Sequence, residues 1–386
     1  MSPDPARLRA TVEYLASIER PSASEGERRA AEWIRDELRS FGVPARVEEE
    51  PAVGSFHVPL ALLSAAGVAA GLAGRPGAAV GALAAAGIAD DVSGGPHLFR
   101  RLLPHRTTYN VVGEAGDRDA GQTIVFVAHH DAAHGGLIFR PELLTLVADR
   151  FPAWYAKQHT SPQVMRLVAA GPALAGLGAA TGSRLLRRAG VAISAASLLA
   201  FLDIATRTVV PGANDNLSAV AVVLELARML RESPVSGVRV LLVSTGSEES
   251  SMEGMRGFVR RHAHALAPER TRVVCLESVG SPELILLEGE GMIRMNDYDP
   301  AMRDFLAAAA QLAGVPLRRG LRSGLATDAL IAHRAGYPTA TIASINEYKM
   351  PDNYHSQRDI AANVDYATVA AAARVSEAAV RSLATG

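Results

Sequence analysis

The chain has 386 residues, enough for one large domain or two ordinary ones, and its apolar content is ample for a core. Its 39 basic and 40 acidic residues give a net charge of −1, which indicates neither a nucleic-acid-binding surface nor an acidic tail. Cys275 is the only cysteine, which excludes an intramolecular disulfide and agrees with a reducing compartment. Since the first residues lack a basic region followed by an apolar one, no secretory signal is indicated and a cytoplasmic location is expected.

Strands and helices alternate along most of the chain. Helical spacing predicts a helix pair in residues 1–42 and a last helix over 364–383, and alternating segments at 45–48 and 109–112 are typical of edge strands. Between them we expect strands at 124–128, 238–243, 273–276 and 339–342, and helices at 218–231, 258–262, 300–313 and 328–335. This alternation predicts one α/β domain over residues 1–386, with a mostly parallel central sheet flanked by helices.

Two stretches, 58–89 and 167–202, break this alternation. Each consists of two apolar segments, rich in Ala and Gly, joined by a turn that contains arginine. We interpret them as apolar helical hairpins inserted into the α/β domain, with boundaries at 58–104 and 137–205. The shorter uncharged segments would reach only about 21 Å at 1.5 Å per residue, whereas a bilayer core is about 30 Å thick. Their length therefore favours a four-helix lid or a homodimer interface over membrane insertion, although so large an apolar cluster needs some cover.

Six residues with metal-binding or acid–base side chains follow or border apolar stretches. They are His129, Asp215, Glu248, Glu249, Glu277 and His355. Ligands of open α/β sheets bind beyond the carboxyl ends of the strands, and three of the predicted strands end at or just before members of this set. Two imidazoles and four carboxylates are the side chains of a two-metal hydrolase with its own general base.

Each of these residues has an ordinary structural explanation when it is taken alone. A solitary histidine is more often a hydrogen-bonded core residue, which is our interpretation of His130 and His134. Asp215 lies in a turn before an apolar helix, where an aspartate is usually a cap. Asp131, two residues after His129, could accept the second ring N–H of that histidine and fix its tautomer. The set as a whole is more specific than its members.

The combined motifs resemble those of the di-zinc aminopeptidase family, within the aminopeptidase and glutamate-carboxypeptidase-like zinc peptidase superfamily. The matching segments are His129 and Asp131 for His-x-Asp, 212–216 for Gly-Ala-x-Asp-Asn, 248–254 for Glu-Glu-x-Gly-Leu-x-Gly, and 354–359 for Tyr-His-x-x-x-Asp. The resemblance covers about residues 1–57, 105–135 and 205–386. The chain departs from it at Ser251 and Met252, which replace Gly and Leu, and at Glu277, where the aminopeptidases mostly have Asp.

The resemblance implies two metal ions, zinc or another divalent cation. The implied ligands are His129 and Glu277 for one Zn²⁺, Glu249 and His355 for the other, and Asp215 as a bridge between the two. The Asp215–Asn216 peptide is expected to be cis. Glu248 would be the general base that activates a water between the metals, and Asp131 would be the second catalytic residue, supporting His129.

The predicted function is a zinc-dependent exopeptidase, specifically an aminopeptidase that acts on peptides or on N-terminal aminoacyl substrates, with no nucleic-acid partner. Two alternatives stay open. One is a carboxypeptidase or an amide deacylase on the same scaffold, and the other is a non-catalytic scaffold that binds a membrane or a partner. Contact with a membrane or a second copy would run through 58–89 and 167–202. The second hairpin lies between His129 and Asp215, so we expect it to modify substrate access.

Overall fold

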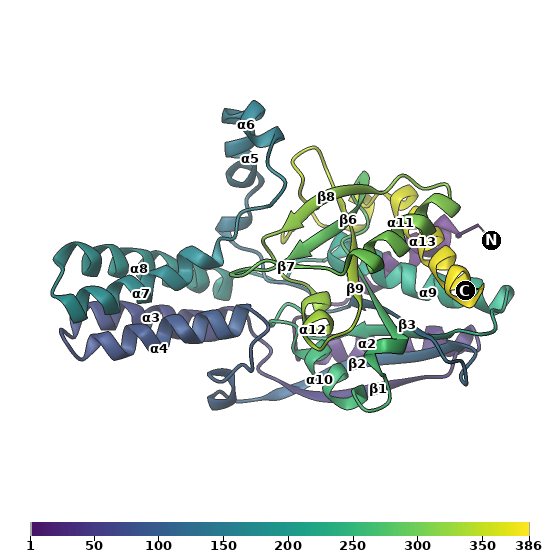
Figure 1. The fold of residues 1–386 in the computed structure, drawn as a ribbon, viewed down its shortest axis with the longest axis horizontal. Helices are drawn as coiled ribbons and strands as arrows, with labels where there is room; N and C mark the ends of the chain where they lie inside the picture. Colours follow the sequence, from purple (N-terminus) through teal and green to yellow (C-terminus); the bar gives the residue numbers. More distant parts are fainter. Residues whose placement is uncertain (1, 386) are drawn as a thin grey trace.

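The computed structural model describes residues 2–385 and has two parts (Figure 1). One part is a central sheet with helices on both faces, and both ends of the chain lie on this part. The other part is a bundle of apolar helices that extends from one side of the sheet domain, to the left in Figure 1. The prediction of an α/β fold with flanking helices is therefore confirmed.

The sheet has nine strands, and its order is β1-β2-β4-β3-β5-β9-β6-β7, with β8 paired to β6. The strands are β1 (Ala45–Ala52), β2 (Arg106–Gly116), β3 (Thr123–His129), β4 (Arg239–Thr245), β5 (Thr271–Glu277), β6 (Glu283–Glu290), β7 (Asn296–Asp297), β8 (Arg318–Ser323) and β9 (Thr339–Ile345). The four central strands β4, β3, β5 and β9 are parallel, and β6 pairs with β8 in parallel. The pairs β1/β2, β2/β4, β6/β9 and β6/β7 are antiparallel.

The sheet is thus mixed, and the prediction of a mostly parallel sheet is wrong outside its centre. The sequence pattern missed β6, which follows β5 after only residues 278–282. A crossover between parallel strands needs a dozen residues or more, so this short connection reverses the chain direction after β5. Since β9 runs parallel to β5, β6 pairs with β9 in antiparallel. The segment 109–112 also belongs to an inner strand, because β2 pairs on both sides.

Alternate residues of the central strands face two separate cores. Ile124 and Phe126 of β3 pack into the larger core, beneath α1 (Pro5–Ala16), α2 (Glu25–Ser40), α9 (Ser218–Glu232), α11 (Pro300–Leu312) and α13 (Tyr366–Thr385). Val125 and Val127 face the opposite core, beneath α10 (Glu253–His262) and α12 (Asp328–Arg334). Burial on both faces explains why these strands are continuous apolar runs.

Four helices occupy the stretches of the predicted apolar hairpins. They are α3 (His57–Leu72), α4 (Gly77–Val92), α7 (Met165–Thr181) and α8 (Arg184–Thr206), and we call them the apolar bundle. Within each pair the helices lie side by side, and α3 and α4 also pack against α8 and α7 of the other pair. Two further helices, α5 (Pro141–Arg150) and α6 (Pro152–Ala156), stand apart at the top of Figure 1. The short turns are η1 (Arg100–Leu102), η2 (Leu137–Phe139), η3 (Ala213–Leu217), η4 (Pro268–Arg270) and η5 (Ala361–Asn363).

Candidate metal centre

The residues predicted to bind metal meet at the carboxyl ends of the parallel strands. His129 is the last residue of β3 and Glu277 is the last residue of β5. Glu248 and Glu249 lie in the loop after β4, and Asp215 lies in the turn η3, where its backbone angles are not helical. His355 follows β9 in a loop. The topology therefore brings together side chains that are spread over more than half of the sequence.

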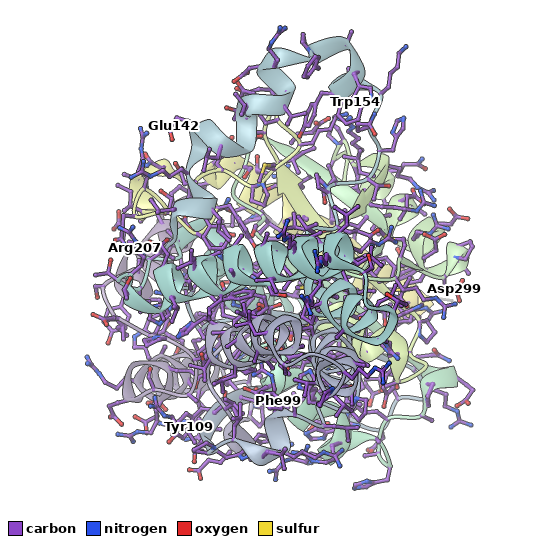
Figure 2. The ribbon with its side chains drawn as sticks, turned by 90° about the vertical axis from the view of Figure 1, so that its left-hand side faces the viewer. Phe99, Tyr109, Glu142, Trp154, Arg207 and Asp299 are labelled. Atoms are coloured by element: carbon purple, nitrogen blue, oxygen red, sulfur yellow. The ribbon has the colours of Figure 1, made fainter. Side chains whose placement is uncertain are left out.

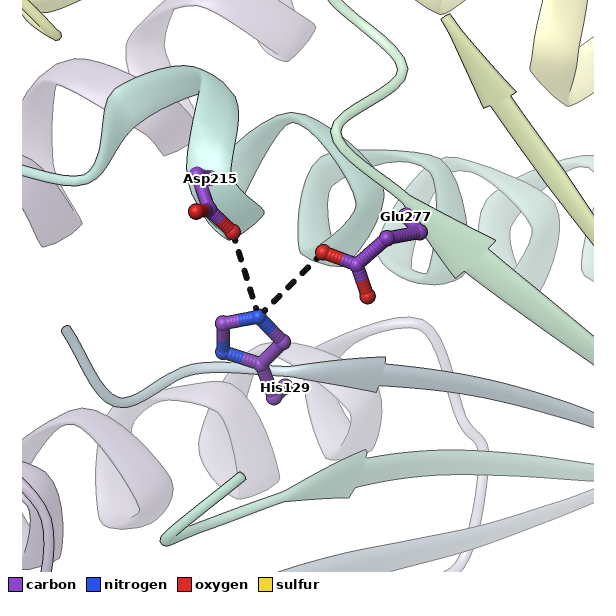
Figure 3. Close-up of side chains that lie close together, drawn as sticks. All are labelled: His129, Asp215 and Glu277. Atoms are coloured by element: carbon purple, nitrogen blue, oxygen red, sulfur yellow. Dashed lines mark ion pairs between the residues drawn. The ribbon is translucent and has the colours of Figure 1, made fainter. Parts of the chain in front are cut away.

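His129 is the centre of the first group, which Figure 3 shows with Asp215 and Glu277. Its Nε2 lies 3.3 Å from Asp215 Oδ1 and 3.5 Å from Glu277 Oε1. Asn216 donates a side-chain N–H to the other oxygen of Glu277, at 3.3 Å. Glu277 thus brings a carboxylate oxygen close to the same histidine nitrogen as Asp215 does.

A second group forms around His355. Its Nε2 lies 3.3 Å from Asp215 Oδ2 and 3.3 Å from Glu249 Oε1. The two oxygens of Asp215 therefore face two different histidines, each of which has a second carboxylate beside it. This is the arrangement that a carboxylate takes when one oxygen is offered to each of two cations.

The chemistry of the site fits divalent cations. Three sets of side chains offer ligand atoms within 4.8 Å of one another, namely His129 with Asp215 and Glu277, His129 with Glu248 and Glu249, and Asp215 with Glu249 and His355. Glu249 Oε1 is buried, and apart from His355 Nε2 at 3.3 Å it has no polar partner among the described residues. Burial raises the pKa of Glu248 well above its usual value and that of Glu277 to about 7, with nearby carboxylates adding to the effect. Cations would relieve this crowding of negative charge.

Asp131 positions His129 and the loop that carries Glu248 and Glu249. Its Oδ1 lies 3.3 Å from His129 Nδ1, as expected of a residue that fixes the tautomer. The same carboxylate accepts the backbone N–H groups of Glu248 and Glu249, at 3.1 and 3.2 Å, and the hydroxyl of Ser22 at 2.6 Å. One buried carboxylate thus orients a histidine and the loop that carries both glutamates.

Asp359 and Arg20 support the turn that carries Asp215. Asp359 accepts hydrogen bonds from the backbone N–H groups of Asn214 and Asp215, at 2.6 and 3.1 Å, and so holds this turn in place. Arg20 is fully buried and donates to the carbonyls of Pro211 and Gly212, at 2.7 and 2.8 Å. The sequence pattern did not identify Arg20, because an isolated arginine before a proline has no spacing that marks it as buried.

The backbone is unusual at the same place. The Asp215–Asn216 peptide is cis, as the family resemblance implies. Several residues of the site loops have positive φ angles, among them Ser247, Ser278 and His355 at 49°, 49° and 50°. Such conformations are uncommon for residues other than glycine and gather at functional sites, where the surrounding structure holds them.

A buried arginine joins the glutamate loop to the apolar bundle. Arg100 of η1 pairs with Asp91 at the end of α4, and both side chains are 2% exposed. Its other nitrogens donate to the hydroxyls of Ser250 and Ser251, both at 2.9 Å, and it lies 3.3 Å from Glu253. Ser251 is a position where the chain departs from the family motif. Its hydroxyl is thus used to bind the segment that follows the first hairpin.

Comparison with known proteins supports the family. Residues 198–380 match the model of a family described as Peptidase family M28. The predicted family resemblance is confirmed. A search of curated proteins found no match.

Solved structures share the fold of this chain over nearly its whole length. An aminopeptidase from Aneurinibacillus sp. strain AM-1 has a TM-score of 0.56 and 15% identity, with 99% of this chain and 94% of that one covered. A Zn-dependent exopeptidase from Parabacteroides distasonis has a TM-score of 0.58 and 12% identity, with 100% and 99% covered. A glutaminyl cyclase from Bacteroides thetaiotaomicron, bound to N-acetylhistamine, has a TM-score of 0.59 and 14% identity, with 99% and 98% covered.

The family match supports a hydrolase of the peptidase type. At identities of this size the structural matches establish the fold alone. Since aminopeptidases and glutaminyl cyclases are both among them, the reaction has to be argued from the site.

Proposed function

We propose that this protein is a zinc-dependent aminopeptidase that uses two metal ions. The observation that carries the proposal is the carboxylate of Asp215, whose two oxygens each lie 3.3 Å from a different histidine. His129 and Glu277 would hold one ion, His355 and Glu249 the other, and Asp215 both. When bound, two such ions polarise the scissile carbonyl and lower the pKa of the attacking water.

Glu248 is the proposed general base. Its Oε2 lies 3.8 Å from His129 Nε2, and its backbone N–H is held by Asp131, so the carboxylate borders the first group from a fixed loop. Burial raises the pKa of Glu248, and a carboxylate with a raised pKa is a better proton acceptor at neutral pH. It would take the proton of the attacking water and deliver it to the leaving amine.

The stretch between His129 and Asp215 borders the site, which supports the expectation that it modifies substrate access. Phe139 of η2 packs edge-on against His355, with ring centroids 4.5 Å apart. The backbone N–H of Leu137 binds Asp203 near the end of α8. The base of the apolar bundle therefore lies beside His355.

Glutaminyl cyclisation is the second candidate, and the fold shared with glutaminyl cyclases favours it. In that reaction the N-terminal amine attacks the side-chain amide of its own residue and ammonia leaves. A carboxypeptidase or an amide deacylase on the same scaffold would instead accept a blocked amino terminus. The three chemistries can thus be separated by the substrate alone.

The test combines a panel of substrates with metal analysis of the purified protein. The purified protein is assayed on chromogenic aminoacyl substrates, N-acetylated peptides and glutaminyl peptides, each with and without a chelator. We expect hydrolysis of free aminoacyl substrates only, loss of activity with chelator, and recovery when zinc is added back. Turnover of acetylated peptides or ammonia release from glutaminyl peptides would assign one of the other reactions. Purified protein that holds no divalent metal and turns over no substrate would favour the non-catalytic scaffold.

A further inference from the structure

The apolar bundle has its small residues inside and many of its large apolar residues outside. The buried residues toward the hairpin turns are mostly glycine, alanine, serine and proline, namely Ser64, Gly67, Ala70, Gly71, Gly77, Gly81, Ala84, Gly171, Pro172, Ala175, Gly176, Gly178, Ala179, Gly190 and Ser194. The exposed ones include Leu62, Leu72, Val80, Leu83, Leu177, Leu185, Leu199 and Leu202. In water the hydrophobic effect places large apolar side chains in the interior, so this distribution is reversed.

The interior glycines let the helix backbones approach closely. A Cβ atom on Gly81 would lie 2.6 Å from the carbonyl oxygen of Pro172, and one on Gly190 would lie 2.2 Å from the backbone nitrogen of Ala175. One on Gly67 would lie 2.5 Å from Ser194 Oγ. Close packing through small residues is the means by which helices associate in lipid, where burial of apolar surface gives no advantage.

Helix α8 has the length and composition of a membrane span. Among the described residues it is the one helix long and apolar enough to cross a bilayer, with 23 residues and a mean hydropathy of 1.8 over its best window. Only 22% of that window is buried in the protein, whereas the core helix of a soluble protein is mostly covered. At 1.5 Å per residue the whole of α8 is about 34 Å long, and its uncharged part, 189–202, is about 21 Å long. The helix therefore crosses a bilayer core of about 30 Å only with its charged ends at the headgroups.

Positive charges gather at the two turns of the bundle. Arg75 lies between α3 and α4, and Arg184, Arg187 and Arg188 form the first turns of α8. No Asp or Glu lies in 58–89 or 167–202, and none of the four arginines forms an ion pair with a described residue. Arginine at the end of an apolar segment extends to phosphate groups at the membrane surface, whereas the same charge at the centre of a bilayer is costly. The positions of these arginines therefore agree with a location of the turns in a headgroup layer, on the side of a bilayer away from the sheet domain.

We propose that the apolar bundle is a membrane-spanning anchor. Its four helices cross the bilayer as two hairpins, and the arginine-bearing turns contact anionic headgroups on the far side. The sheet domain stays on the near side, since each hairpin returns the chain to it. The three shorter helices have 16 or 17 residues, which a locally thinner bilayer and arginine side chains that extend to the surface can accommodate.

The anchor would place the metal centre at the membrane surface. Larger side chains fill the base of the bundle, where Leu60, Ile88, Phe201 and Ile204 form a separate core with Phe139 at its border. Phe139 also contacts His355 of the metal centre. Figure 2 views the molecule from the side on which the bundle extends, and Trp154 of α6 lies above the bundle in that view.

Fractionation of the full-length protein tests the proposal first. We expect it to sediment with membranes, to remain there after alkaline carbonate, and to enter solution only with detergent. The purified protein should also insert into vesicles of phosphatidylcholine with phosphatidylglycerol. A monomer that stays in solution without detergent would instead indicate a lid and overturn the proposal.

A triple variant separates lipid contact from a dimer interface. Leu83→Gln, Leu177→Gln and Leu199→Gln change exposed residues of three bundle helices, and Leu312→Gln is the matched control, because Leu312 is 75% exposed on the sheet domain. We expect at least a tenfold shift of the triple variant into the soluble fraction and none for the control. The proposal would be contradicted if the native protein is a dimer without detergent and the triple variant is a monomer under the same conditions.

Cysteine labelling tests whether the bundle crosses the bilayer. The native Cys275 is buried and gives little background, so Arg75→Cys reports the hairpin turn and Ser40→Cys reports the sheet domain. In sealed vesicles an impermeant maleimide should label the two variants from opposite sides. Labelling of both from one side would show that the bundle does not cross and would overturn the proposal.

Discussion

The sheet domain and the apolar bundle are both rich in apolar residues, yet they arrange them in opposite ways. In the domain, large side chains such as Ile124, Phe126 and Leu242 are fully buried between the sheet and its helices. In the bundle, glycines such as Gly81 and Gly190 are buried, while Leu83 and Leu199 are exposed. The first arrangement is stabilised by removing apolar surface from water, and the second by close contact between backbones. This difference is the observation on which the proposed membrane anchor rests.

Loss of the proposed base is the largest effect we expect, and it concerns the sheet domain alone. Glu248→Gln should keep its metal content while kcat falls by about 10²–10⁴-fold, the range of general acid–base catalysis. The measurements are metal analysis and kcat on an aminoacyl substrate. Glu347→Gln, at an exposed glutamate in the loop after β9, is the control. Normal turnover by Glu248→Gln would rule out the assignment of the base.

Removal of Arg100 tests the connection between the two parts. Arg100→Ala leaves Asp91 and Glu253 buried without their partner, and the free energy of unfolding should fall by about 3–5 kcal/mol. Activity should fall as well, because Ser250 and Ser251 lose their donors beside Glu248.

The neighbouring residue is the control for that experiment. Arg101→Ala changes an exposed arginine in the same turn and should alter stability by less than about 0.5 kcal/mol. Denaturant unfolding and kcat of both variants measure the comparison. Equal effects of the two substitutions on stability and kcat would show that the buried pair of Arg100 and Asp91 does not stabilise the protein more than an exposed arginine does.

Overpacking of the bundle interior tests the contrast in packing. Gly81→Leu forces a side chain against the backbone of Pro172 and Gly176 and should destabilise the protein by about 1–3 kcal/mol. Ala79→Leu, on an exposed position of the same helix, should have little effect. Thermal unfolding in detergent measures both variants. A stable Gly81→Leu variant would mean that the helices do not depend on close approach.

A buried carboxyl of the sheet domain makes the stability of the protein depend on pH. Burial raises the pKa of Glu290 from 4.5 to about 8, so the folded state keeps a proton that the unfolded chain releases. Stability should therefore fall as the pH rises from about 4.5 to 8. Glu290→Gln should remove that loss, so its stability relative to the native protein should rise between pH 5 and pH 8. Glu283→Gln, exposed on the same strand, is the control in pH-dependent unfolding. A Glu290→Gln gain that is equal at both pH values would contradict the prediction.

Much of the site was predictable because its residues follow recognisable apolar runs. His129 and Glu277 end buried strands, and the glutamate pair follows a third. Since parallel strands end at one edge of a sheet, the pattern already indicated that these side chains meet. Arg20 was not predictable, because its burial depends on carbonyls of a turn about 190 residues away.

The sequence by itself determined the α/β alternation, the chemistry of the site and the apolar character of the two hairpin stretches, because residue type and spacing carry that information locally. Only the tertiary structure decided the mixed order of the sheet, since β6 pairs with a strand that comes much later in the chain. It also decided which side of each bundle helix is buried. Composition shows that Gly and Leu are both abundant there, but only packing shows that glycine lies inside and leucine outside.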